Sequence, residues 1–243
     1  MRAAEGSTPA SHRWTTAGLV VVLVATGAIA ATYSPLFAAG DIRLRGATGI
    51  PRQDVLSLAR IDDRSNVFHL DTRGAERRLE RDPRILTARV TTSLPDGIEI
   101  EIVPRVAVAV LGREGELVGD DGVVIGPAGP DVDLPALVTA DGHPPVDDAL
   151  ASAAATAGAL DGRLRGDVEA VVIAPDGRIR VRLTAGFPVT FGSASELSAK
   201  AESLAALLAW IEEEEVAVFS ADLTVPGSPT AKLDRGSGSV PVS

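Results

Sequence analysis

The chain has 243 residues, which allows one large domain or two small ones, and its 45% hydrophobic content excludes a wholly disordered protein. Its 33 acidic residues outnumber the 23 Lys and Arg residues, and the resulting net charge of -10 argues against a nucleic-acid partner. Because the chain has no Cys, disulfides, thiolate chemistry and Cys-ligated zinc are excluded. The chain has only five Phe, two Trp and one Tyr, so its core must be built mainly from aliphatic side chains.

The N-terminal region contains a long apolar segment. From Trp14 to Gly40, 27 consecutive residues carry no charge, and a helix needs about 20 mostly apolar residues to cross a bilayer. Trp14 and Tyr33 are separated by about 28 Å along a helix, which suits one aromatic anchor at each membrane interface. We therefore expect a cytoplasmic stub over residues 1–13 and a transmembrane helix over residues 14–39. The expected membrane-anchoring residues are Trp14, Leu19, Val22, Leu23, Ile29 and Tyr33.

A cleaved signal peptide is the alternative interpretation of this segment. Arg2 and Arg13 would form its basic region, residues 17–27 its apolar region and Ala28-Ile29-Ala30 its cleavage site. The uncharged stretch is long for a signal peptide, which favours the retained anchor. Both interpretations export the residues that follow, because long downstream domains are translocated largely regardless of their charge.

Residues 40–105 are predicted to form a small α+β domain. Three segments alternate apolar and polar residues and are expected to be strands: 41–46, 85–93 and 98–102. Two helices are expected between the first and second strands. Pro51 can open the first, which would end near Ala59, and Asp71 or Thr72 can cap the second, which Pro83 would end near Arg81. The predicted order is therefore β-α-α-β-β, with both helices on one face of a three-stranded sheet.

Six short motifs follow one another at characteristic spacings. They are Ile42-x-Leu44-x-Gly46, Asn66-Val67-Phe68-x-Leu70-Asp71, Asp82-Pro83-Arg84-Ile85-x-x-Ala88-x-Val90, Leu94-Pro95-Asp96-Gly97-Ile98-x-Ile100, Leu117-Val118-x-Asp120-x-x-Gly122 and Leu134-Pro135-x-Leu137. In order and spacing, the chain resembles the FtsQ/DivIB cell-division family, whose POTRA domain the first four motifs match. Two positions depart from the family pattern. Pro104-Arg105-Val106-Ala107 replaces the usual Glu-Arg-x-Pro, and Ile50 replaces a common Ser or Thr helix cap.

Residues 106–233 are predicted to form a longer β-rich unit, which the resemblance identifies as the β domain of the family, with a mixed sheet and flanking helices. Its expected strands are 106–110, 123–125, 168–173, 179–183, 189–191, 216–225 and 230–233. Helices are expected over residues 146–160 and after Ser193-Ala194-Ser195-Glu196, which fits a capping box. Residues 126–145 are interpreted as a surface loop and residues 234–243 as a flexible tail.

No catalytic constellation is evident in the sequence. His12, His69 and His143 lack partners at metal-ligand spacing, and no Ser stands three residues before Lys200 as a Ser-x-x-Lys motif would require. Lys200 is instead interpreted as the i,i+4 partner of Glu196. The four acids at residues 212–215 are interpreted as a solvated helix end. We predict a protein that is not an enzyme, with no metal, cofactor or small-molecule substrate.

The resemblance implies a non-catalytic scaffold of the bacterial division machinery that helps to control septal peptidoglycan synthesis. Its implied location is the cell membrane at the septum, as a single-pass type II protein, and its implied partners are FtsB/DivIC-like and FtsL-like proteins, with septal peptidoglycan synthases as further candidates. Partner binding would use the last strand, whose outer edge is expected to be open: Thr230, Ala231, Lys232 and Leu233. An exported cell-wall hydrolase and a secreted, signal-cleaved binding protein are the alternatives.

Overall fold

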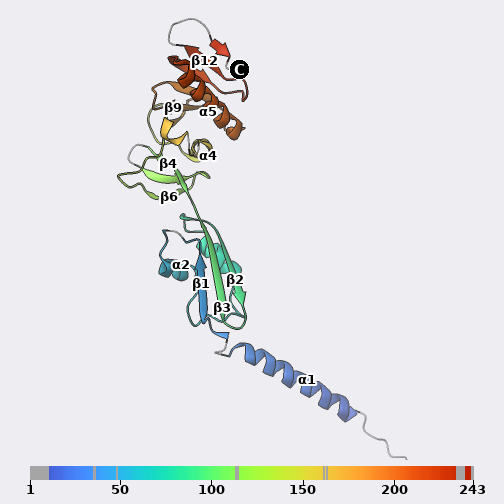
Figure 1. The fold of residues 1–243 in the computed structure, drawn as a ribbon. Coiled ribbons are helices and arrows are strands. Elements are labelled where there is room, and N and C mark those ends of the chain that lie inside the picture. Colours follow the sequence, from blue (N-terminus) through green and yellow to red (C-terminus); the bar gives the residue numbers. More distant parts are fainter. Residues whose placement is uncertain are drawn as a thin grey trace, which may run out of the picture. The chain divides into compact units, whose positions relative to one another are not determined.

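The computed structural model describes residues 11–34, 37–47, 49–112, 115–160, 162, 164–233 and 239–241, with the backbone alone for residues 11–17 and 239–241. The chain divides into two compact units, Met1–Pro104 and Arg105–Ser243. Figure 1 labels several elements of each unit. The division falls between Pro104 and Arg105.

The first unit begins with a 22-residue helix, α1 (Ser11–Thr32). Leu19, Val22, Leu23 and Ile29 are more than 60% exposed, and so is Tyr33 just beyond the helix. The side chain of Trp14 lies outside the described residues. Within the part of the chain that the structure describes, no helix has both the length and the apolar character needed to span a membrane.

A three-stranded sheet and two helices follow α1. In chain order the elements are β1 (Asp41–Arg45), α2 (Arg52–Ala59), α3 (Thr72–Leu79), β2 (Ile85–Ser93) and β3 (Gly97–Pro104). The strand order is β1-β3-β2, with β1 parallel and β2 antiparallel to β3. This arrangement confirms the predicted β-α-α-β-β order of an α+β unit.

Strict alternation along β3 places one face of this sheet against the helices. Ile98, Ile100 and Ile102 are at most 2% exposed and pack in one cluster with apolar residues of α2 and α3. Glu101, between two of them, is exposed. The sequence pattern is thus confirmed residue by residue, because a period of two assigns alternate side chains to opposite faces.

Local hydrogen bonds fix the ends of the two helices. The carboxylate of Asp71 accepts a hydrogen bond of 2.9 Å from the backbone N–H of Gly74, which confirms Asp71 as the N-cap of α3. The N-cap of α2 is Pro51, whose ring has no hydrogen-bond acceptor, so this helix has no side-chain cap bond. The Arg78 guanidinium donates to the Ala59 carbonyl at 2.7 Å and so links α3 to the end of α2.

The Asp82-Pro83-Arg84 motif forms a compact ion pair before β2. Asp82 accepts hydrogen bonds from the backbone N–H of Arg84 at 2.9 Å and from its guanidinium at 2.7 and 2.9 Å. These bonds from Arg84 hold the pKa of the Asp82 carboxyl below its usual value. The motif therefore stabilises the turn that leads from α3 into the sheet.

The second unit is built on one ten-stranded mixed sheet. Its strands are β4 (Ala107–Leu111), β5 (Glu116–Gly119), β6 (Val124–Pro127), β7 (Ala136–Thr139), β8 (Val168–Ile173), β9 (Ile179–Leu183), β10 (Pro188–Gly192), β11 (Val218–Asp222), β12 (Thr230–Leu233) and β13 (Ser239–Pro241). Its helices are α4 (Asp147–Ala159), the short 3-10 helix η2 (Arg165–Asp167) and α5 (Leu197–Glu214). The spatial order is β13-β12-β11-β10-β9-β8-β7-β4-β5-β6.

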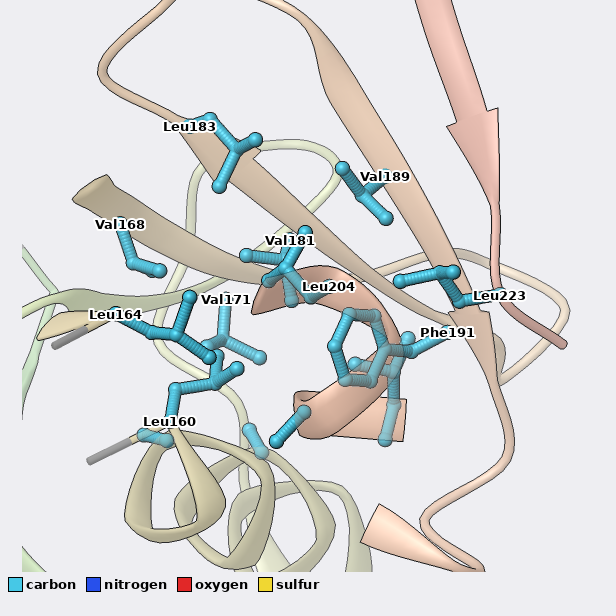
Figure 2. Close-up of a cluster of buried hydrophobic side chains, with 14 of the residues drawn as sticks. Leu160, Leu164, Val168, Val171, Val181, Leu183, Val189, Phe191, Leu204 and Leu223 are labelled. Carbon is cyan, nitrogen blue, oxygen red and sulfur yellow. The ribbon is translucent and has the colours of Figure 1, made fainter. Parts of the chain in front are cut away.

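The core of the second unit lies between the sheet and its helices. Figure 2 shows buried side chains from β8, β9 and β10 meeting Leu204 of α5, with Leu160 at the end of α4 nearby. Phe191 is the largest of them and is fully buried. Apart from this one ring, the labelled residues are aliphatic, as the composition predicts.

Two local predictions for this unit are wrong. The predicted surface loop over residues 126–145 contains β7, which pairs in parallel with both β4 and β8 and whose Leu137 is fully buried. Four residues flanked by turn-forming residues are too few to show a strand pattern. The predicted capping box is also absent: α5 has Glu196 as its N-cap, in a left-handed conformation and without a side-chain cap bond.

Candidate partner-binding edge

The four residues predicted to bind a partner form a strand near one end of the large sheet. β12 pairs antiparallel with β11, with Ala231 opposite Ala221 and Thr230 opposite Asp222. Ala231 is fully buried, whereas Thr230 and Lys232 are exposed on the other face. The structure therefore confirms the predicted strand and shows which of its side chains are accessible.

The expectation that the outer side of β12 is open is wrong. β13 lies along it in antiparallel register, with Thr230 opposite Pro241, Ala231 opposite Val240 and Lys232 opposite Ser239. The segment interpreted as a flexible tail thus provides the outermost strand of this end of the sheet. Three residues are too few to show alternation, and Gly and Ser dominate the residues before them. The only feature of the sequence that favours a strand here is the β-branched Val240.

A polar groove crosses β9, β10, β11 and β12 on the face opposite the core. It has a volume of about 280 Å³ and is lined by Arg180, Pro188, Thr190, Ser220, Ala221, Asp222, Thr230 and Lys232. Strand register explains how these residues meet, because Thr190 is paired with both Arg180 and Asp222. Thr230 and Lys232 form the rim of this groove on the side of β13. Two cations and one carboxylate make the groove suitable for polar rather than apolar contacts.

One aromatic residue next to β12 was not identified from the sequence. The β11–β12 register shifts between Val218 and Ser220, which leaves Phe219 in a bulge with a 66% exposed side chain. A bulge turns a side chain away from its expected face, so alternation alone could not have predicted this exposure. Exposed aromatic side chains of this kind are frequent anchors of protein interfaces.

Lys200 of α5 holds the end of β10 in place. Its side chain is fully buried, and its Nζ donates hydrogen bonds to the carbonyl oxygens of Phe191 at 2.7 Å and Ser193 at 2.9 Å. Lys200 does interact with Glu196, as its i,i+4 spacing predicts, but its burial and its bonds to two carbonyl oxygens were not expected from the sequence. Burial lowers the pKa of Lys200, and the carboxylates of Glu196 and Asp222 offset part of that effect.

The bulge at the end of β10 explains why this lysine is needed. The β9–β10 register shifts between Thr190 and Gly192, and Gly192 has a φ of 73°, a left-handed value that favours glycine. The lysine bonds to carbonyl oxygens on both sides of Gly192. It thereby supports the strand that carries Thr190 into the polar groove.

Both edge strands of the first unit have backbone groups bonded to side chains. On β2, the N–H of Val90 donates to Glu76 Oε1 at 2.9 Å and the N–H of Ala88 donates to Glu80 Oε1 at 3.3 Å. On β1, the carbonyl of Ile42 accepts a hydrogen bond of 2.5 Å from Arg52 Nη2. Backbone groups occupied in this way are not free to pair with an added strand.

The histidines lie apart from one another and from any cluster of acids in the described ranges. His69 stacks on Tyr33 with ring centroids 4.2 Å apart, and its Nε2 lies 3.0 Å from Thr32 Oγ1. His143 pairs with Asp141 at 3.1 Å on the surface, and the side chain of His12 lies outside the described residues. Among the residues that the structure describes, no three His, Cys, Asp or Glu side chains come together as a potential metal site.

Two family matches cover most of the chain. Residues 37–105 match the family described as POTRA domain, FtsQ-type, and residues 107–223 match Cell division protein FtsQ/DivIB, C-terminal. The second match ends after β11, so β12 and β13 lie beyond it.

Curated cell division proteins FtsQ are similar to the chain over much of its length. The protein of Mycolicibacterium smegmatis is 29% identical over 194 residues, which are 79% of this chain and 58% of the relative. That of Mycobacterium tuberculosis is 29% identical over 192 residues, or 78% of this chain and 60% of the relative. That of Streptomyces griseus is 31% identical over 176 residues, or 67% of this chain and 83% of the relative. The chain thus spans about three-fifths of the length of the two mycobacterial relatives.

Proposed function

Because the chain belongs to the FtsQ/DivIB family of cell division proteins, we propose that it is a non-catalytic, membrane-anchored scaffold of the bacterial division machinery. Its proposed role is to bind FtsB/DivIC-like and FtsL-like proteins at the septum and to help control septal peptidoglycan synthesis, with the septal synthases as further contacts. The observation that carries the proposal is the end of the large sheet at β12, where an exposed polar groove and an exposed aromatic residue lie together.

The way in which each sheet edge is occupied favours this end of the sheet over the other candidate edges. In the first unit, Glu76, Glu80 and Arg52 already bond to backbone groups of β2 and β1. At the opposite end of the large sheet, β6 has four residues and ends in Pro127, which has no N–H to donate. β12 is bordered by a strand of only three residues. We therefore place the addition of a partner strand along β12.

The proposed anchor is the segment over residues 14–39, with the N-terminus in the cytoplasm. Its support is the uncharged stretch from Trp14 to Gly40 and the exposed aliphatic side chains of α1. The proposal is tested by determining the N-terminus of the protein recovered from native membranes. A mature chain starting at Ala31 would identify a cleaved signal peptide and contradict the anchor.

Proline substitutions test strand addition directly. Ala231→Pro and Lys232→Pro each remove one backbone N–H of β12, and one of the two N–H groups faces the outer side. We expect the variant at the outward position to remain folded and lose the FtsB/DivIC-like partner in co-purification, and the other variant to lose stability. Lys232→Ala keeps the N–H and measures the contribution of the side chain alone, so the effect of Lys232→Pro is compared with that of Lys232→Ala. If both proline variants fold and bind the partner with unchanged affinity, strand addition at β12 is wrong.

A further inference from the structure

The last strand of the chain occupies the place that a partner strand would take. β13 pairs with the outer side of β12 over three residues, and an added strand would use the same N–H and C=O groups of β12. We propose that β13 is a built-in competitor, which must leave β12 before a partner strand can add. The inference rests on the proposed function, because it assumes that β12 is the partner-binding strand.

The pairing of β13 is well suited to reversible release. The strand comprises only Ser239, Val240 and Pro241. Successive N–H groups point to opposite sides of a strand and Pro241 has none, so β13 can donate at most one N–H to β12. In contrast, β11 on the other side of β12 includes the buried Ala221 and follows the core helix α5. β11 is therefore part of the core, whereas β13 is joined to β12 over three residues only.

The tether makes β13 an effective competitor despite its short length. Five residues connect Leu233 to Ser239, so pairing is intramolecular, with an effective concentration on the order of millimolar for a short linker. A partner binds only the fraction of molecules in which β12 is free. If β13 is paired about 90% of the time, its removal would increase the apparent partner affinity about tenfold.

The position of β13 also explains why displacement is favoured over addition to its outer side. Thr230 and Lys232 of the groove rim lie directly opposite Pro241 and Ser239. A partner strand in the same place lies against the groove and its charged residues. A strand added outside β13 would be one strand further from the groove and would meet the edge that contains a proline.

A deletion and a reversible lock test the inference in the full chain. Deleting residues 239–243 removes β13, and deleting residues 242–243 alone is the matched control that keeps it. The lock is the double variant Lys232→Cys with Ser239→Cys, which joins two residues that are opposite in the register. Because the chain has no Cys of its own, a single disulfide can form. The probe is the purified FtsB/DivIC-like protein of the same bacterium, and the measurement is its dissociation constant.

We expect the deletion of 239–243 to strengthen binding about tenfold, with the control unchanged. The oxidised double variant should lose binding, and reduction should restore it to the level of the Lys232→Cys single variant, which lacks the same groove side chain. Equal or weaker binding after the deletion, or full binding by the oxidised form, would overturn the inference. The proposed function would then still stand, because the partner binds. If the unmodified chain, the deletion and the reduced variant all fail to bind, the proposed function is wrong and the inference falls with it.

Discussion

The Nζ of Lys200 in α5 donates a hydrogen bond of 2.7 Å to the main-chain carbonyl of Phe191 at the end of β10. With a second bond to Ser193, it joins a buried helix face to the bulge that carries Thr190 toward the polar groove. The stability of the candidate site therefore depends on a residue that does not contribute to its surface.

The first prediction concerns the pH dependence conferred by Lys200. Burial lowers its pKa in the folded chain, so between the folded and unfolded pKa values the folded chain binds fewer protons than the unfolded chain. The free energy of unfolding should therefore rise with pH in that window, up to the unfolded pKa of about 10.4. Lys200→Met should remove this rise and destabilise the unit by about 1–3 kcal/mol, because the Phe191 carbonyl loses its partner.

Urea unfolding followed by the fluorescence of Trp210, which packs against the core from α5, measures this effect at several pH values. A Trp14→Phe background leaves Trp210 as the single tryptophan. Identical pH profiles for the unmodified chain and the Lys200→Met variant would show that Lys200 does not cause the pH dependence of the stability.

The second prediction tests the register of β3. Ile100→Ala should lower the stability of the first unit by about 2–5 kcal/mol, because Ile100 is fully buried between the sheet and its helices. Glu101→Ala, one residue later and exposed, should change stability by less than about 0.5 kcal/mol. Thermal unfolding of both variants provides the comparison, and equal losses would mean that the register is wrong.

The third prediction concerns the protected edge of β2. Glu76→Ala combined with Glu80→Ala should free the N–H groups of Val90 and Ala88 and allow the edge to pair with another chain. We expect self-association, measured by analytical ultracentrifugation. Glu212→Ala combined with Glu213→Ala removes the same charge away from this edge and is the control. A double variant that sediments like the unmodified chain would show that the two glutamates do not protect the edge.

The fourth prediction assigns partner affinity to Phe219. Phe219→Ala should weaken binding of the FtsB/DivIC-like partner at least about tenfold, because an exposed aromatic residue beside the binding strand can supply an interface anchor. The melting temperature should hardly change, since the ring is 66% exposed in the free chain. Unchanged affinity in titration calorimetry would show that Phe219 does not contribute to the proposed interface.

The sequence was most informative where a pattern extends over several residues. The alternation of Ile98, Ile100 and Ile102 predicted both a strand and its buried face, and Asp71 was one of two residues predicted to cap α3. Patterns of this length depend on local geometry alone. The order of the elements in the first unit could therefore be predicted from the sequence.

The features that were missed depend on distant contacts or on very short segments. β7 and β13 have four and three residues, which is too few for a periodic signal, and each is defined by the strands that it joins. Lys200 has the i,i+4 spacing of a surface pair, but spacing does not show which helix face the sheet covers. Phe219 is exposed because a bulge shifts the register, and a bulge has no marker in this sequence.

Site-specific photo-crosslinking in dividing cells tests the central claim, which is that a division partner binds along β12. A photoreactive residue is placed at position 232 of the full chain, with position 101 on the exposed side of β3 as the control. The account predicts a crosslink to the FtsB/DivIC-like protein from position 232 and none from position 101. A crosslink to that protein from position 101 together with none from position 232 would contradict it.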